Sequence, residues 1–290
     1  MLRNRRRRVR LVAERVFARG GVSRTAFYGR QPVLAYRFDM PERSGASQSR
    51  CYEALMDVAS YYQTLTEQRA AIMAECIADG PTFAMHVASH NVLKDFELML
   101  GVISGPERSI FMQACREYQY SLEAIVFGNY RHAFSSLRLA FELFTATIYF
   151  SANQMKMHLW LQGHDDLWWA TLTDSDKGVF SHNFMKAFNP PLGQYRSQYS
   201  GLASAVYREC SEYVHGNPGT HEDVALVIAY DAKRVQSFHD KVATVRLCVL
   251  FQFVSRYLRE LGSVGRDAVE HLVIEAFGDL PEIQSTFGAA

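Results

Sequence analysis

An arginine and a histidine lie seven positions apart in the stretch RECSEYVH, which runs from Arg208 to His215. Seven helical residues return to within about 20° of the starting direction, so both side chains share one face, about 10 Å apart along the axis. Ser211 and Glu212 fall between them on that face. Histidine can take the proton of an RNA 2′-hydroxyl, and arginine can stabilise charge on a phosphate, so this face has the groups for metal-free RNA cleavage.

A structural explanation of the same residues remains open. Arg208 and Glu212 have the i, i+4 spacing of a surface ion pair. His215 stands where the predicted helix ends, and a cationic imidazole is favoured there by the helix dipole. The polar face would then be solvated and have no chemical role.

The helix that carries these residues is predicted over residues 196–214. Leu202, Val206, Cys210 and Val214 form an apolar stripe on a different side, which we expect to face a core. The sequence Gly216-Asn217-Pro218 supplies the stop signal after the helix.

The rest of the chain predicts an all-α fold, because apolar residues recur at helical spacing and Gly and Pro are scarce, at 18 and 8 of 290 residues. We expect a basic arm or linker over residues 1–47, a helical segment over 48–105 and a helical bundle over 106–290. A Trp-rich helical insertion is expected within the bundle, at residues 155–192. The predicted helices cover about residues 50–78, 82–102, 106–127, 130–154, 182–188, 196–214, 233–261 and 266–277.

Three features together resemble the HEPN superfamily. Arg208 and His215 are separated by six residues at the end of a late helix. The stretch from Gly128 to Glu142 is similar to the "Gly-x-Tyr … Ala … Leu-Arg … Glu" early helix of that group, and Ser211 to Gly216 is similar to its "S-x-x-V-H-G" ending. The likeness covers about residues 106–262 and does not reach the first 105.

The resemblance implies a HEPN-like four-helix bundle, here with additional N-terminal helices, that dimerises and cleaves RNA without metal. Many members act as toxins or effectors of antiviral defence. By this likeness His215 is the general base or acid and Arg208 is the cation that stabilises the phosphate. The auxiliary or substrate-binding residues that we expect beside them are Glu209, Ser211, Glu212, Arg138 and Glu142.

Two of these auxiliary positions carry a second interpretation. Active members often have Asn, Asp or His after the arginine, whereas this chain has Glu209, whose carboxylate would repel a phosphate. Arg138 and Glu142 lie four residues apart and are equally compatible with a plain ion pair. The alternative function is therefore a catalytically inactive HEPN-like module that binds a partner protein or a nucleotide.

Charge and composition set the expected partners. The first 19 residues carry eight arginines against Glu14, a net charge of +7, so the remainder carries −6 within a total of +1. We expect RNA as substrate and a homodimer with a composite site. The basic arm is open to two interpretations, a solvated leader or a segment that guides RNA to the otherwise acidic chain. A defence-system or antitoxin protein is a further candidate partner. A DNA-binding or membrane-surface role of residues 1–19 is a weaker alternative.

Other chemistries lack their usual motifs. We find no Walker A loop, no Rossmann fingerprint, no H-E-x-x-H and no G-x-S-x-G. One loose cluster could ligate a metal, although its spacing fits no zinc pattern; its members are His158, His164, Asp165 and Asp166. Five scattered cysteines and the lack of an apolar run long enough for a bilayer indicate a cytoplasmic protein. We expect no cofactor and no metal.

Overall fold

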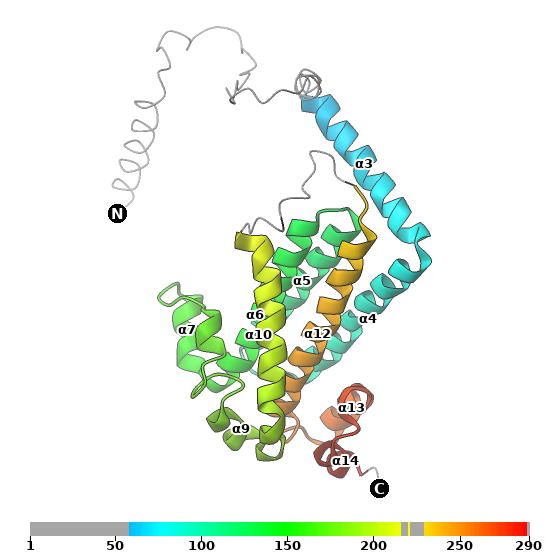
Figure 1. Cartoon of the computed structure of the whole chain (residues 1–290). Coiled ribbons are helices and arrows are strands. Elements are labelled where there is room, and N and C mark those ends of the chain that lie inside the picture. Colours follow the sequence, from blue (N-terminus) through cyan, green and yellow to red (C-terminus); the bar gives the residue numbers. More distant parts are fainter. Residues whose placement is uncertain (1–57, 216–219, 221–228, 289–290) are drawn as a thin grey trace, which may run out of the picture. The chain divides into compact units, whose positions relative to one another are not determined.

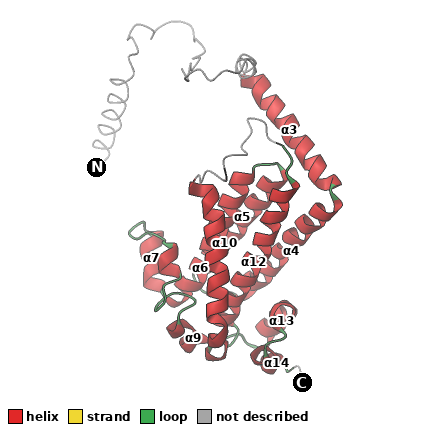
Figure 2. Cartoon of the chain, in the orientation of Figure 1, coloured by secondary structure: helices red, strands yellow, loops and turns green. Residues whose placement is uncertain are grey.

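The computed structural model describes residues 58–215, residue 220 and residues 229–288 (Figure 1). Within these ranges every regular element is a helix, and no strand occurs (Figure 2). The all-α prediction is therefore confirmed for the part of the chain that the structure describes. The predicted arm at residues 1–47 lies outside the described residues, as do residues 48–57, 216–219, 221–228 and 289–290.

The helices follow the predicted ones closely. The long helices are α3 Val58–Ala78, α4 Gly80–Val102, α5 Arg108–Val126, α6 Tyr130–Ala152, α10 Arg196–His215, α12 Ala232–Tyr257 and α13 Ser263–Phe277. The shorter elements are α7 Gln154–Leu161, α8 Trp169–Leu172, α9 His182–Phe188, the 3₁₀ helix η1 Pro190–Tyr195 and α14 Pro281–Phe287. The sequence analysis did not anticipate η1 and α14.

Helix α6 lies at the centre of the packing. It packs against α5, α10 and α12, and α10 also packs against α12 (Figure 1). Its residues from Ala140 to Phe150 are buried on all sides, which is the pattern of a helix enclosed by neighbours. Phe134, Phe141 and Phe144 on α6 are almost completely buried and form the middle of the core. The site helix α10 is thus supported by the most buried element of the fold.

The turn between α5 and α6 makes these helices antiparallel neighbours. Gly128 has φ 72°, a left-handed conformation that glycine adopts without a Cβ penalty. The N–H of Asn129 donates to the carbonyl of Ala124 at 2.9 Å and closes the end of α5. Helices α5 and α6 therefore form a helical hairpin.

The start of α12 is tied to the start of α6. Asp231 caps α12 by accepting from the N–H of Arg234 at 3.1 Å. Its own N–H donates to the hydroxyl of Tyr130 at 2.7 Å. Because Tyr130 is the first residue of α6, this contact fixes the two helices to each other at one end.

The Trp-rich segment is helical and partly joins the core. Trp160 and Trp169 pack against the buried cluster, whereas Trp168 is 63% exposed. Leu172 and Met157 from the same segment are fully buried.

No described helix is both long and apolar enough to cross a bilayer.

Candidate functional site

Helix α10 buries one side and exposes the other, as its sequence predicts. Ala203, Val206 and Cys210 are buried towards the helices that it packs against, α6 and α12. Burial raises the pKa of the Cys210 thiol to about 12, which leaves it as an unreactive core residue. Arg208 and His215 are exposed.

Arg208 and His215 lie on the same helix, and His215 is its last residue. Neither side chain forms a hydrogen bond or an ion pair with any residue that the structure describes, including the expected partner Glu212. Glu212 is also exposed, and its backbone carbonyl accepts from Thr220 Oγ1 at 3.4 Å. The guanidinium and the imidazole are therefore accessible to a ligand on the solvent side of α10.

Glu209 occupies the position where active HEPN members often have Asn, Asp or His, and its side chain has a partner. Its carboxylate lies 2.8 Å from Nζ of Lys241 on α12. Lys241 is the more buried of the two, with its side chain 15% exposed against 47% for Glu209. Part of the negative charge beside Arg208 is therefore neutralised by a cation from the neighbouring helix.

Arg138 on α6 reaches across to α10. Its Nε donates to Ser211 Oγ at 2.9 Å, and its guanidinium lies over the ring of Tyr207, 4.5 Å from the centroid. It also donates to the hydroxyl of Tyr207 and lies 3.6 Å from a carboxylate oxygen of Glu142. The i, i+4 ion pair predicted as the alternative is present, but the same arginine also joins two helices.

Glu142 and Tyr207 complete this contact. The Tyr207 hydroxyl donates to the carboxylate of Glu142 at 3.3 Å. Burial raises the pKa of Glu142, although the neighbouring Arg138 opposes this. Burial, and then the charge of Glu142, raises the pKa of Tyr207 to about 12. The other face of the network is covered by Trp169, whose ring is stacked on Tyr207 at 4.0 Å.

We call Arg138, Glu142, Tyr207, Ser211 and Trp169 the α6–α10 brace. It brings three of the predicted auxiliary residues together, namely Arg138, Glu142 and Ser211. Tyr207 and Trp169 were not predicted, because nothing in a single sequence shows which aromatic ring an arginine will meet. The brace holds α10 against α6 and so fixes the orientation of the exposed face.

The C-terminal end of α10 has a second support from α6. Arg131 donates through Nη2 to the carbonyl of Val214 at 3.3 Å. This bond satisfies one of the free carbonyls at a helix end, next to His215. Arg131 belongs to the early motif of the sequence but was not predicted to contact α10.

The predicted metal alternative does not come together. Among the residues that the structure describes, no three His, Cys, Asp or Glu side chains form a group that could ligate a metal. Asp165, one of the four candidates, is paired with Lys156 at 2.8 Å.

The fold and site thus define a class: an all-helical protein with an exposed arginine and histidine on one braced helix. Comparison with known proteins adds nothing to this definition, because no family model, curated protein or solved structure matches the chain.

Proposed function

We propose that this protein is a HEPN-like, metal-independent endoribonuclease with Arg208 and His215 as its catalytic residues. The observation that carries the proposal is that both side chains are exposed on one helix and lack a partner among the described residues. Functional groups that must contact a substrate need this combination of accessibility and a fixed backbone.

In the proposed reaction, His215 accepts the proton of the ribose 2′-hydroxyl. The 2′-oxygen forms a bond to phosphorus, and the bond from phosphorus to the 5′-oxygen breaks. Arg208 stabilises the negative charge that grows on the phosphoryl oxygens. The 5′-oxygen leaves with a proton from solvent or from a second histidine, and the products are a 2′,3′-cyclic phosphate and a 5′-hydroxyl.

Lys241 removes the main objection to this assignment. A free carboxylate at Glu209 would repel the phosphate, but the ion pair with Lys241 at 2.8 Å offsets its charge. The α6–α10 brace supports the proposal in another way, because Ser211, on the candidate face, accepts from Arg138 at 2.9 Å and is held in place.

We further propose that the active form is a cytoplasmic homodimer and an effector of antiviral defence. Arg208 and His215 lie about 10 Å apart along the helix axis, so a second copy could supply the other pair around one phosphate. The eight arginines of the first 19 residues would draw RNA towards a chain that otherwise carries −6.

The test is cleavage of total RNA in EDTA by the full chain, followed by analysis of the product ends. Wild type should yield 2′,3′-cyclic phosphate ends. His215→Ala should lower the rate about a hundredfold or more, because one acid–base group supplies that much. The matched control is His271→Ala, which removes an exposed imidazole from α13 and should cleave like wild type.

The assay also separates the two functional classes. If wild type and His215→Ala leave RNA equally intact, the nuclease proposal is wrong. The catalytically inactive binding module is then the function to pursue, by measuring whether Arg208→Ala weakens capture of an RNA or a nucleotide.

A further inference from the structure

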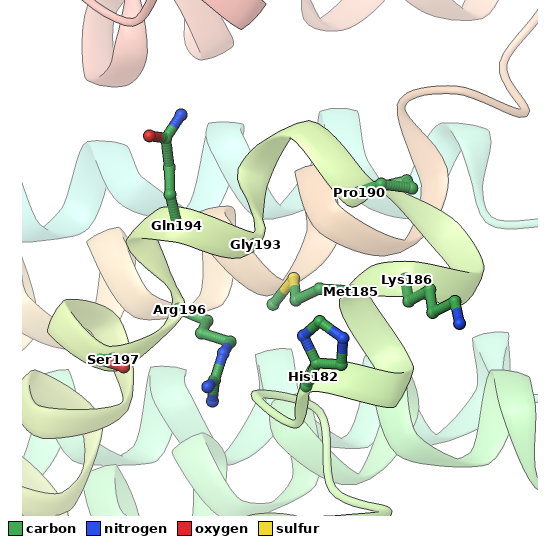
Figure 3. A pocket seen from close by; sticks show the side chains of 8 residues that line it. All are labelled: His182, Met185, Lys186, Pro190, Gly193, Gln194, Arg196 and Ser197. Carbon is green, nitrogen blue, oxygen red and sulfur yellow. The ribbon is translucent and has the colours of Figure 1, made fainter.

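A second group of cations lies at the other end of α10. A cavity of about 650 Å³ opens between α9, η1 and the first turn of α10. His182 and Lys186 line it from α9, and Arg196 and Ser197 line it from α10 (Figure 3). Arg196 lies 12 residues before Arg208, which corresponds to about 18 Å along the helix, so this cavity is separate from the proposed nuclease face.

The cations of the cavity are not neutralised by any residue that the structure describes. None of the described residues that line it is acidic. His182, Lys186 and Arg196 form no hydrogen bond or ion pair with any described side chain, and Arg196 is half-buried. These cations are therefore open to an anion from solvent.

Glu282 is an acidic group that contacts a residue of the cavity lining, and it is occupied by other donors. Glu282 on α14 accepts from Nε2 of Gln194 at 2.5 Å and from the hydroxyl of Tyr195 at 3.1 Å. Its two oxygens are therefore taken by neutral donors outside the group of cations. Among the described residues this carboxylate forms no ion pair with Arg196 or Lys186, so both cations remain open to an external anion.

The rest of the lining suits an organic ligand. Pro190 supplies exposed apolar surface, Met185 is almost completely buried at the base of the lining, and Gly193 lies beside Met185 (Figure 3). The volume falls within the range of about 300–1,000 Å³ that is typical of small-molecule sites. The guanidinium fork of Arg196 suits bidentate contact with a phosphate monoester, and Lys186 adds a second positive charge to the lining.

We propose that this cavity binds the phosphate group of a small phosphomonoester, such as a nucleoside monophosphate. Arg196 holds the phosphate through its guanidinium, Ser197 and His182 donate further hydrogen bonds, Lys186 adds positive charge at the edge of the cavity, and the organic part lies against Pro190. The proposal does not depend on the nuclease assignment, because it uses other residues.

The experiment is calorimetric titration of the full chain at low salt with AMP, inorganic phosphate and adenosine. AMP and phosphate should bind and adenosine should not. Arg196→Ala should weaken AMP binding about tenfold or more, because charge-assisted hydrogen bonds are lost, and Lys186→Ala severalfold, because a positive charge is lost. Arg116→Ala removes an exposed arginine from α5 and should bind AMP like wild type.

Two further arms make the outcome decisive. The double variant Arg208→Ala/His215→Ala should retain AMP binding. If this variant does not bind AMP, the ligand lies on the nuclease face and the proposal is overturned. Equal binding of adenosine and AMP would overturn it, as would binding of an RNA fragment without a terminal phosphate while AMP and phosphate fail to bind. Arg196→Lys, which keeps the charge without the fork, should show an intermediate loss and guards against misfolding of the alanine variant.

Discussion

The solvent face of α10 and the packed contacts between helices use the same residue types in opposite ways. Arg208 and His215 are exposed and have no partner among the described residues. Arg138, one helix away, meets Ser211, Tyr207 and Glu142 at once. His239 on α12 is buried, with Ser89 Oγ 2.8 Å from its Nδ1. The comparison teaches that the chemistry of a side chain does not reveal its role, whereas its accessibility and its partners do.

The largest effect should come from Arg208. Arg208→Ala should lower RNA cleavage by about a hundred- to a thousandfold, or about 2.7–4 kcal/mol in the barrier, because a donor to the developing charge is lost. The free energy of unfolding of this variant should change by less than about 0.5 kcal/mol, because Arg208 is exposed and forms no hydrogen bond or ion pair with a described residue. Cleavage rates and urea unfolding of the same preparation test both halves.

A large loss of stability in Arg208→Ala would contradict the distinction between the two regions. Arg116→Ala is the control for removing an exposed arginine elsewhere.

The buried histidine should make the fold sensitive to acid. Burial, and then the nearby His86, lowers the pKa of His239 from 6.5 to about 4. Between pH 6.5 and about 4, the imidazole of His239 is protonated in the unfolded chain and neutral in the folded chain. The free energy of unfolding therefore falls as the pH falls. The loss should be on the order of 3 kcal/mol over the whole window, or about 1.4 kcal/mol per pH unit.

His239→Gln keeps a hydrogen-bonding group for Ser89 and should flatten the dependence of unfolding free energy on pH between about 6.5 and 4. The slope should not vanish, because burial also lowers the pKa of His86. His271→Gln, at an exposed position on α13, should leave the wild-type slope unchanged. An unaltered slope in His239→Gln would show that the buried imidazole is not the sensor.

Arg138 should act on stability first. Arg138→Ala leaves the buried carboxylate of Glu142 without its cation and should cost about 1–3 kcal/mol of unfolding free energy at neutral pH. Glu142→Gln removes the buried negative charge that Arg138→Ala leaves unpaired. The double variant should therefore be more stable than Arg138→Ala alone. Additive losses in this double-mutant cycle, measured by urea unfolding, would show that the two residues do not interact.

The smallest effect should come from Lys241. Lys241→Ala frees the charge of Glu209 beside Arg208 and should weaken RNA binding only a few-fold, because Glu209 is 47% exposed and solvent screens its charge. Adding Glu209→Gln should restore binding, since the repelling charge is then gone. RNA affinity at low salt measures both, and a failure of Glu209→Gln to restore it would mean that Lys241 acts in another way.

Much of this architecture follows from local sequence. Helical periodicity and the positions of Gly and Pro place α4, α5, α6, α10 and α12 within a few residues. The two sides of α10 also follow from the sequence, because a regular helix converts residue spacing directly into direction. Arg208 and His215 could therefore be placed on one polar face, and Val206 and Cys210 on an apolar one, without a structure.

Tertiary structure alone decided which polar groups are already taken. Glu209 finds Lys241, and Arg138 finds Tyr207 and Ser211, between residues separated by many positions along the chain. The cavity at Arg196 needs α9, η1 and α10 to meet, and η1 itself was not predicted. Spacing along a helix is fixed by its hydrogen bonds, but contacts between helices depend on how all the side chains of the core pack together. The sequence could therefore present candidates for chemistry, and the packing determined which of them remain accessible to a ligand.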